Sequence, residues 1–357
     1  MKEATTMVVV GTDVHKRTHT FVAVDEVGRK LGEKTVPATT AGHLKALTWA
    51  RLEFGEDLLW GIEDCRNLSA RLERDLLSAR QQVVRVAPKL MAQARASART
   101  RGKSDPIDAL AVAHAVLRHP DLPVAAHDTV SHELKLLVDR REDLVGQRTS
   151  TINRLRQRVH QLDPAVEPQL ANLHREPARA RLAEWLGTQD GLLAELAGDE
   201  LADITRLSAA IDDLAERIGD RVRTVAPALL ELPGCGELTA AKLVAETAGV
   251  HRFRSEAAFA RHSGAAPVPV WSGNTAGRVR LTRSGNRQLN AALHRIAITQ
   301  IRLTTSAGHA YYRKRLASGN SKTEALRCLK RRLARVVYQR LRTDDLTQHH
   351  SHQSTAA

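Results

Sequence analysis

Met7-Val8-Val9-Val10-Gly11-Thr12 is a short apolar run, and Asp13 follows it directly. An apolar run of this length predicts a buried strand. An acid at its end would stand at the edge of a sheet and be held there by rigid backbone. Residues 20–25 and 31–36 predict two further strands, which a hairpin turn at residues 26–29 joins.

The segments that follow alternate between helical and strand patterns. Helices are predicted at residues 41–54 and 68–79, and strands at residues 58–63 and 83–87. Such alternation predicts an α/β sheet with helices packed on it.

Further acids close one of these strands and open a helix. Glu63 is the last residue of the strand Leu-Leu-Trp-Gly-Ile-Glu. Asp64 competes with it, but neighbouring residues of a strand point to opposite faces, so only one of the two can point inward. Asp105 and Asp108 begin a helix that we expect to reach about residue 118, and their i, i+3 spacing places both on one side of its first turn.

Asp13, Glu63, Asp105 and Asp108 together suggest a metal site. Hard cations such as Mg²⁺ prefer oxygen ligands, and a metal pair about 3.5–4 Å apart stabilises both the attacking and the leaving oxygen of a phosphoryl transfer. Each acid alone has a structural alternative. Asp105 is a good N-cap before Pro106, Asp108 would meet the helix dipole, and Asp13 would end a strand in a turn. As a set, the four acids favour a pocket that holds metal against phosphate.

The charge of the chain favours a polyanionic partner. Among 357 residues there are 54 Lys and Arg against 40 Asp and Glu, which gives a net charge of +14. Residues 278–342 hold 17 basic residues and one acid, Glu324, and residues 89–103 hold five basic residues and no acid. Nucleic acid is the simplest such partner, and a basic surface without one is the alternative. Aromatic residues make up only 3%, so base stacking on an aromatic platform is disfavoured.

The middle of the chain is predicted to be helical. Pro120 and Pro123 mark a boundary, after which residues 130–162 are apolar at i, i+3 and i+4, and a second helical stretch covers residues 178–225. Together they predict an antiparallel helical hairpin, which would be a coiled-coil arm. A dimerisation arm and a helical spacer without a partner remain equal alternatives.

A glycine-rich turn opens the last third of the chain. Leu232-Pro233-Gly234-Cys235-Gly236 followed by a helix from about Leu238 predicts a helix-hairpin-helix. Backbone N–H groups at such a helix start bind phosphate without reading bases. The alternative is a plain helical turn.

Two serines of the basic loop region are candidate nucleophiles. Ser272 precedes Gly273, which would present its hydroxyl on an open turn. Ser284 is equally eligible, although residues 284–286, Ser-Gly-Asn, are more simply the cap of a helix from about Arg287 to Leu303. A serine hydroxyl attacks a phosphodiester only when a base, metal or cation activates it, and from the residues alone a structural role for Ser272 is favoured. Four arginines would hold the attacked phosphate: Arg278, Arg280, Arg283 and Arg287.

Other features indicate the compartment. The three cysteines are far apart and form no zinc-binding spacing, which predicts reduced thiols. No apolar run reaches the 18 or so residues of a membrane helix, and the first residues do not form a signal peptide. We therefore expect a cytoplasmic protein. The polar tail at residues 343–357 is expected to be disordered, and its histidines at 349, 350 and 352 more simply belong to a solvated tail than to a metal site.

The order of these motifs resembles the DEDD transposases of one bacterial insertion-sequence group, which are bridge-RNA-guided recombinases. The resemblance covers nearly the whole chain and is specific because the motifs occur jointly. It departs from the family pattern at residues 64–66, Asp-Cys-Arg, where a small residue and glycine are common. The motifs are Gly11-Thr12-Asp13-Val14-His15-Lys16, Gly61-Ile62-Glu63, Lys103-Ser104-Asp105-Pro106-Ile107-Asp108-Ala109, Leu232-Pro233-Gly234-Cys235-Gly236, Ser272-Gly273 and Ser284-Gly285-Asn286-Arg287.

The resemblance implies an α/β RNase H-like (RuvC-like) DEDD domain at residues 1–125 and a helical coiled-coil region at 126–225. It also implies a mainly α transposase domain with a helix-hairpin-helix at 226–342, before the tail at 343–357. The four acids would bind Mg²⁺ or Mn²⁺, and Ser272 would join covalently to DNA while the acids of another subunit complete the site. A structured guide RNA would choose the DNA by base pairing.

These expectations combine into a transposase of a mobile insertion sequence, active as a homodimer or homotetramer in the prokaryotic cytoplasm at the nucleoid, with no membrane contact. The phosphate backbone would be held by Lys103, Gly234, Gly236, Arg278, Arg280, Arg283 and Arg287. One rival is a metal-dependent, junction-resolving endonuclease that uses the acids and water. The other is a nucleic-acid-binding protein without catalysis.

Overall fold

The computed structural model describes residues 7–63, 66–96, 104–120, 122, 124–125, 129–166, 170–269, 272–275, 279–281 and 285–355. They fall into two compact units, one made of Met1–Thr129 and Thr247–Asp345 and the other of Val130–Glu246 and Leu346–Ala357. The domain boundaries expected from the sequence remain predictions.

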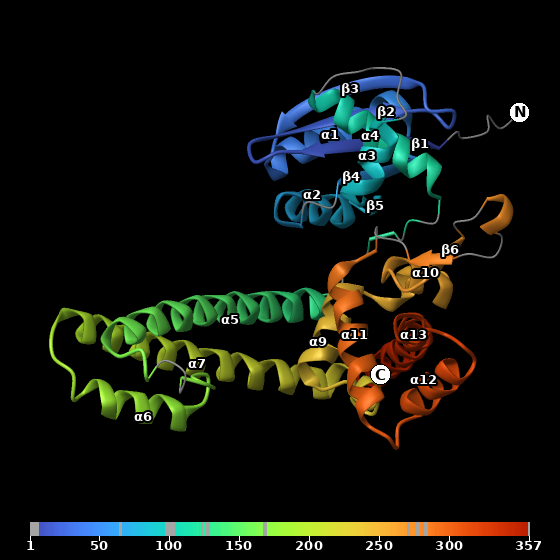
Figure 1. The fold of residues 1–357 in the computed structure, drawn as a ribbon. Coiled ribbons are helices and arrows are strands. Elements are labelled where there is room, and N and C mark those ends of the chain that lie inside the picture. The colour runs from blue at the N-terminus through green and yellow to red at the C-terminus, as the bar shows by residue number, and fades with distance from the viewer. Residues whose placement is uncertain are drawn as a thin grey trace, which may run out of the picture. The chain divides into compact units, whose positions relative to one another are not determined.

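A five-stranded mixed sheet forms the N-terminal part of the chain. Its order is β3-β2-β1-β4-β5, with β1, β2 and β3 antiparallel and β4 and β5 parallel to β1 (Figure 1). The predicted hairpin and the predicted sheet with helices packed on it are therefore confirmed, and the sheet is mixed. The strands are β1 Val8–Val14, β2 Thr18–Val24, β3 Lys30–Pro37, β4 Leu58–Glu63 and β5 Gln82–Val86.

Helices cover both faces of this sheet because its strands are apolar on both sides. On one face Val10, Trp60 and Ile62 pack with α1 (Thr40–Phe54) and α2 (Arg66–Ser78). On the other face Val9, Val22 and Val84 pack with α3 (Pro88–Ala96) and α4 (Asp105–Arg118). The helix α4 carries two of the predicted site acids, so its position on the sheet decides where they lie.

The middle region is a pair of long helices with a shorter one between them. Leu144 of α5 (Thr129–Leu162) packs with Leu207, Ile211 and Leu214 of α7 (Leu192–Val225), while Leu155 lies in a core with Leu201 and Ile204. The later residue of α5, Leu155, packs with the earlier residues of α7. The two helices therefore run antiparallel, as the predicted hairpin requires. A coiled-coil arm remains a prediction.

The second predicted helical stretch is interrupted, which the sequence analysis missed. The helix α6 (Glu176–Leu186) ends at Gly187, and Gly191, with φ +94°, precedes α7. Glycine adopts this left-handed backbone without a Cβ penalty. Two glycines four positions apart, Gly187 and Gly191, therefore break the helix, and apolar periodicity alone does not reveal this break.

The C-terminal region is mainly helical. Its first three α-helices are short: α8 (Pro227–Leu230), α9 (Glu237–Thr247) and α10 (Glu256–His262). A two-stranded antiparallel hairpin of β6 (Pro267–Pro269) and β7 (Val279–Leu281) separates them from α11 (Arg287–Arg302), α12 (Ala307–Ala317) and α13 (Lys322–Thr355). Inside, the Tyr338 hydroxyl of α13 donates to the Phe253 carbonyl at 3.1 Å, so α13 is tied to the residues before α10.

The predicted disordered tail differs from the structure, in which α13 continues as helix through Thr355. The segment from residue 343 to 355 contains neither glycine nor proline, so nothing in it ends a helix that is already anchored by buried residues such as Leu341.

Candidate metal centre

Two glycines bring α4 into direct contact with the sheet. Gly11 of β1 and Gly61 of β4 are register partners. A Cβ atom on Gly11 would lie 2.2 Å from the carbonyl oxygen of Ala109, and one on Gly61 would lie 2.6 Å from Cγ2 of Val116. Any side chain at Gly11 would therefore displace α4, so this glycine fixes how closely the helix rests on the strands.

Asp13 and Glu63 extend the same face of the sheet. The last pair of β1 and β4 is Thr12 with Ile62, and each acid is the next residue of its strand. Alternate strand residues share a face, so Asp13 and Glu63, each two residues beyond its glycine, lie on the face that α4 covers. Both acids therefore lie at the same edge of the sheet.

The first turn of α4 brings two more acids to this edge. Ligand atoms of Asp13, His15 and Asp105 all lie within 4.8 Å of one another. The ring Nε2 of His15 is 2.9 Å from Oδ2 of Asp13 and 3.3 Å from Oδ1 of Asp105. Asp108, one turn further along α4, is close enough to raise the pKa of Asp13 by charge repulsion. Of the four predicted acids, Asp13 and Asp105 thus share this group, Asp108 lies close by, and Glu63 follows the last register pair of β1 and β4.

The electrostatics of this cluster fit a bound cation. Asp13 is only 5% exposed, and burial is the largest cause of the rise in its pKa; Asp108 and Asp105 raise it further, while His15 opposes the rise. A buried carboxylate near two others is costly unless positive charge compensates it. Carboxylate oxygens are the ligands that Mg²⁺ and Mn²⁺ prefer, whereas an imidazole nitrogen suits softer divalent metals better. The residues present therefore fit a divalent metal.

Two residues of the site have no assigned role in the sequence analysis. His15 stands two residues after Asp13, and this alternation is the signal that could have found it. Arg95 of α3 donates through Nη1 to Oδ1 of Asp108 at 2.5 Å. It belongs to the basic stretch expected to hold phosphate, whereas the structure turns its guanidinium to an acid of the site. A pairing between two helices leaves no mark in the sequence.

The start of α4 differs in one detail from the prediction. Ser104, not Asp105, is the N-cap, although its side chain makes no capping hydrogen bond, and Asp105 is the first helical residue. The Asp105 carboxylate is half exposed and contacts His15. The structural alternative, in which Asp105 is the N-cap, is therefore not what the structure shows, and the carboxylate lies in the cluster.

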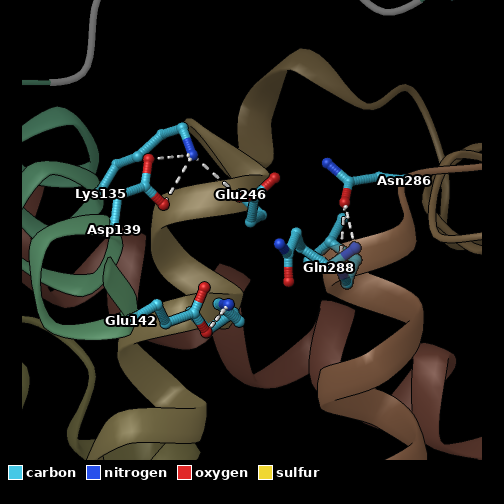
Figure 2. Close-up of polar contacts among 8 residues, drawn as sticks. Lys135, Asp139, Glu142, Glu246, Asn286 and Gln288 are labelled. Carbon is cyan, nitrogen blue, oxygen red and sulfur yellow. Dashed lines mark hydrogen bonds and ion pairs between the residues drawn. The ribbon is translucent and has the colours of Figure 1, made fainter. Parts of the chain in front are cut away.

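The residues predicted for catalysis and phosphate binding in the C-terminal region are only partly described. Ser272 is exposed and lies between β6 and the short 3-10 turn Gly273–Thr275, and Arg287 is exposed at the start of α11. Asn286 caps α11, as predicted, by accepting from the backbone N–H groups of Gln288 and Leu289 (Figure 2). Arg280 lies in β7, where only the backbone is described, and three predicted contacts lie outside the described residues: Lys103, Arg278 and Arg283.

The predicted phosphate-binding turn lies between α8 and α9. Gly234 has φ +86°, which favours glycine, and α9 begins at Glu237. The Glu237 carboxylate pairs with Arg223 of α7 and lies against Gly219, where a Cβ atom would be 2.4 Å from its Oε2. Its charge is thus compensated at α7. The helix-hairpin-helix and its phosphate contacts through Gly234 and Gly236 remain predictions.

Reciprocal ion pairs join α9 to α5 in the same unit (Figure 2). Lys242 of α9 is 2% exposed, and its ammonium pairs with Glu142 of α5. Seven residues earlier on α5, Lys135 Nζ lies 2.9 Å from Asp139 and 3.0 Å from Glu246 of α9. Each helix thus supplies a lysine to a carboxylate of the other, Lys135 to Glu246 and Lys242 to Glu142, so a shifted register would separate both pairs.

None of the helices within the described ranges is long and apolar enough to cross a membrane.

Comparison with solved structures finds two of Thermus thermophilus RuvC, one of them in complex with a Holliday junction substrate. Each is 17% identical in sequence, has a TM-score of 0.26 and matches 32% of this chain; the match covers 94% of the chain in the complex and 95% of the other.

Similar proteins extend over almost the whole sequence. The insertion element IS900 uncharacterized 42 kDa protein of Mycobacterium paratuberculosis is 27% identical over 97% of this chain and 98% of its own length. The insertion element IS116 uncharacterized 44.8 kDa protein of Streptomyces clavuligerus is 27% identical over 93% and 94%. A putative transposase of Sinorhizobium fredii, y4pF/y4sB, is 30% identical over 54% of this chain and 50% of its own.

Two family models match separate parts of the chain. A DEDD model described as a transposase matches residues 10–164, which include all four predicted acids. A second model, described as transposase IS116/IS110/IS902 family, matches residues 226–313, which include Ser272. Together they span more than half of the sequence, and the chain belongs to the IS116/IS110/IS902 family of transposases, enzymes that cut and rejoin DNA.

Proposed function

We propose that this transposase cuts and rejoins DNA through a covalent bond to Ser272, with divalent metal held by Asp13, Glu63, Asp105 and Asp108. The observation that supports the metal site is that a buried Asp13 of β1, whose pKa is raised, lies close to Asp105 and Asp108 of α4. Glu63 of β4 directly follows the last register pair of the two strands. The mixed sheet with acids at the ends of its two central parallel strands supports an RNase H-like domain of the RuvC type.

In the proposed reaction the hydroxyl oxygen of Ser272 attacks a backbone phosphorus, and its proton passes to a base. The displaced deoxyribose oxygen leaves and takes up a proton. One P–O bond forms as another breaks, so the phosphodiester energy is kept in the bond between Ser272 and DNA. Rejoining is the reverse attack by a DNA hydroxyl, and it needs no ATP.

Each residue of the metal site has a part in this scheme. Asp13 and Glu63 are held by adjacent strands, and Asp105 and Asp108 by one helical turn, so the four oxygen ligands sit on rigid elements. Arg95 holds Asp108 in place by its hydrogen bond at 2.5 Å. When bound, the metal supplies positive charge that stabilises the attacking and leaving oxygens.

Nucleic acid would be held mainly through its backbone. The basic residues of 278–342 and few aromatics favour phosphate contacts over base stacking. We expect the phosphates to contact the exposed Arg287 and the backbone N–H groups near Gly234 and Gly236. A structured guide RNA would then choose the DNA by base pairing, so that the protein reads only shape and backbone.

The test is covalent attachment of DNA. Labelled insertion-element DNA is incubated with protein, Mg²⁺ and any RNA that copurifies, and the mixture is resolved on a denaturing gel. We expect an adduct with the wild type, none with Ser272→Ala, and none after chelation of metal. Ser284→Ala tests the competing serine, and Ser318→Ala is the matched control because Ser318 is also an exposed serine of the C-terminal region.

The same gel separates the proposal from a junction-resolving endonuclease that uses the four acids and water. The acid cluster alone would serve that reaction, so the endonuclease predicts strand cleavage that persists in Ser272→Ala with no adduct in any variant. A binding protein without catalysis predicts no cleavage at all, and binding that is unchanged in Asp13→Asn.

The guide RNA and the oligomer need separate measurements. Protein purified from its natural host should carry a discrete RNA that sequencing identifies, and removal of that RNA should abolish target choice. Light scattering of the purified protein should give the mass of a dimer or tetramer. If the protein is a monomer without RNA and still forms the serine adduct, the proposed reaction stands. The proposed guide RNA and the proposed oligomer would then be wrong.

A further inference from the structure

An amide side chain of α11 binds the backbone at the root of the hairpin that carries Ser272. Asn290 of α11 donates through Nδ2 to the carbonyl of Ser263 at 2.9 Å and to that of Gly264 at 3.1 Å. These two residues follow α10 and come directly before the approach to β6. One side chain of α11 therefore holds the backbone that enters the hairpin.

The outgoing end of the hairpin returns to the same place. The backbone N–H of Asn286 donates to the carbonyl of His262 at 2.6 Å. A Cβ atom on Gly285 would lie 2.3 Å from the Cα of Gly264, so the two backbones are in contact where chain enters and leaves. The described residues at the two ends of the hairpin, His262 to Gly264 and Gly285 to Asn286, are thus held within one small cluster.

Lys330 of α13 determines how the Asn290 amide is oriented. Its Nζ donates to Oδ1 of Asn290 at 2.5 Å. An ammonium group only donates hydrogen bonds, so the oxygen of the amide must face Lys330 and the nitrogen must face the two carbonyls. The two carbonyls favour the same orientation, so loss of Lys330 would remove one of the three hydrogen bonds that hold the Asn290 amide.

Lys330 is placed where a lysine is costly. It is 7% exposed, and burial, followed by repulsion from Arg327, lowers its pKa. Lysine is almost never fully buried unless it is paired, and here its described hydrogen bond is to a neutral amide. A buried lysine at this position therefore indicates a role beyond filling space in the core.

We propose that Asn290 and Lys330 are positioning residues that hold the root of the β6–β7 hairpin and thereby set the position of Ser272. This inference rests on the proposed role of Ser272 as nucleophile. Neither residue touches DNA in this scheme. Both act through the backbone of Ser263 and Gly264, which is why their loss should slow the chemical step and leave DNA affinity unchanged.

The first measurement is the rate of adduct formation at saturating DNA, together with the DNA dissociation constant. We expect Lys330→Met and Asn290→Leu to form the Ser272 adduct on the order of 10- to 100-fold more slowly, with affinity within about twofold of the wild type. Lys322→Met is the matched control, because Lys322 is exposed at the start of the same helix and its loss changes the net charge equally.

Conservative variants separate positioning from charge and from packing. Lys330→Gln keeps a donor for Oδ1 and should recover most of the rate lost in Lys330→Met. Asn290→Asp keeps the acceptor for Lys330 and loses the Nδ2 donors, so it should be as slow as Asn290→Leu. Equal rates in wild type, Lys330→Met and Asn290→Asp, all folded by thermal unfolding, would overturn the proposal, as would loss of rate that only follows loss of DNA affinity.

A second measurement does not depend on activity. Amide hydrogen exchange in peptides from residues 265–286 should be faster in Lys330→Met and Asn290→Leu than in the wild type, while peptides from α5 and α7 keep their rates. Unchanged exchange in the hairpin would also overturn the positioning role. A wild type that forms no serine adduct, combined with faster hairpin exchange in both variants, would reject the proposed nucleophile and retain the structural lock.

Discussion

Gly11 of β1 lies against the backbone of α4, where a Cβ atom would come within 2.2 Å of the carbonyl oxygen of Ala109. This contact decides how far the first turn of α4 reaches over the edge of the sheet. Asp105 and Asp108 are in that turn, and Asp13 is two residues beyond Gly11. One missing side chain therefore supports the assembly of the acid cluster.

Gly11→Ala should move α4 and impair the site. We expect a loss of about 1–3 kcal/mol in the free energy of unfolding, because the added methyl overlaps backbone atoms that belong to two packed elements. The rate of metal-dependent DNA cleavage should fall by more than the loss of folded protein explains. Gly146→Ala in α5 is the control, since a Cβ atom there meets nothing within 4 Å, and alanine should stabilise that helix by up to about 1 kcal/mol. Equal Tm and activity in Gly11→Ala and wild type would show that α4 adapts.

Asp13→Asn should stabilise the protein while abolishing cleavage. Asp13 is 5% exposed and close to Asp105 and Asp108, so removal of its charge relieves a buried repulsion. Thermal unfolding without metal should therefore occur at higher temperature in the variant than in the wild type. Added Mg²⁺ should then raise the Tm of the wild type. At a hundredfold excess over Kd, bound Mg²⁺ should add about 2.7 kcal/mol to its free energy of unfolding. The Tm of the variant should rise less.

The control for that experiment is Asp143→Asn, which removes an exposed carboxylate from α5 and should respond to Mg²⁺ as the wild type does. A wild type whose Tm is indifferent to Mg²⁺ and Mn²⁺ would contradict a metal site at these acids.

His15→Ala should weaken metal binding without removing the site. The ring nitrogen lies 2.9 Å from Asp13 and 3.3 Å from Asp105, either as a further ligand or as the donor that orients both carboxylates. Loss of such a group costs about 10- to 100-fold in metal affinity. Cleavage should therefore require more Mg²⁺ and return at high concentration, whereas exposed His132→Ala should leave the Mg²⁺ dependence unchanged. If cleavage depends on Mg²⁺ concentration identically in both variants, His15 has no part in metal binding.

The charge pair between α5 and α9 should behave as a coupled unit. Glu142→Gln deprives the buried Lys242 ammonium of this carboxylate and should cost about 1–3 kcal/mol, discounted because Glu142 is 38% exposed. Replacing both residues with Met should cost less than the sum of the single changes. Urea unfolding of the four proteins gives the coupling energy, and additive effects would mean that the pair does not hold α9 to α5.

Acid should destabilise the unit that contains His19. Burial, followed by the neighbouring His43, lowers the pKa of His19 to about 4 from 6.5. Between these values the unfolded state binds more protons than the folded state, so stability is full above pH 6.5 and falls as pH drops towards 4. The loss should reach about 3 kcal/mol.

Urea unfolding across this pH range measures the slope. His19→Gln should flatten it, and exposed His132→Gln should not. His262, whose pKa burial and Arg252 lower to about 3, contributes a slope of the same sign, so the His19 variant reduces the slope without removing it.

Local patterns predicted most of the secondary structure but not its interruptions. The apolar run before Asp13 and the strand ending at Glu63 gave the strands and their acidic ends, because alternation and apolar runs are local properties of the chain. The break at Gly187 and Gly191 was missed because periodicity continues on both sides of it. The helical continuation of α13 was missed because a polar composition says little about a helix that begins in a buried segment.

The sequence indicates which acids are candidate ligands of a metal, and it does not indicate the residues that support them. Asp13, Glu63, Asp105 and Asp108 are acids at element ends, which the sequence displays. Arg95 bonds Asp108 across two helices, and Asn290 is oriented by Lys330 across forty positions. Such pairs depend on which helix faces which, and no spacing rule encodes that.

The sequence by itself determined the strands, the long helices, the basic C-terminal segment and the identity of the acids, because these follow from period, composition and residue chemistry. Only the tertiary structure decided that α4 rests on Gly11, that His15 lies between Asp13 and Asp105, and that one amide holds the root of the Ser272 hairpin. Those outcomes depend on close packing, in which a single methyl group or a buried ammonium decides which neighbouring residues come into contact.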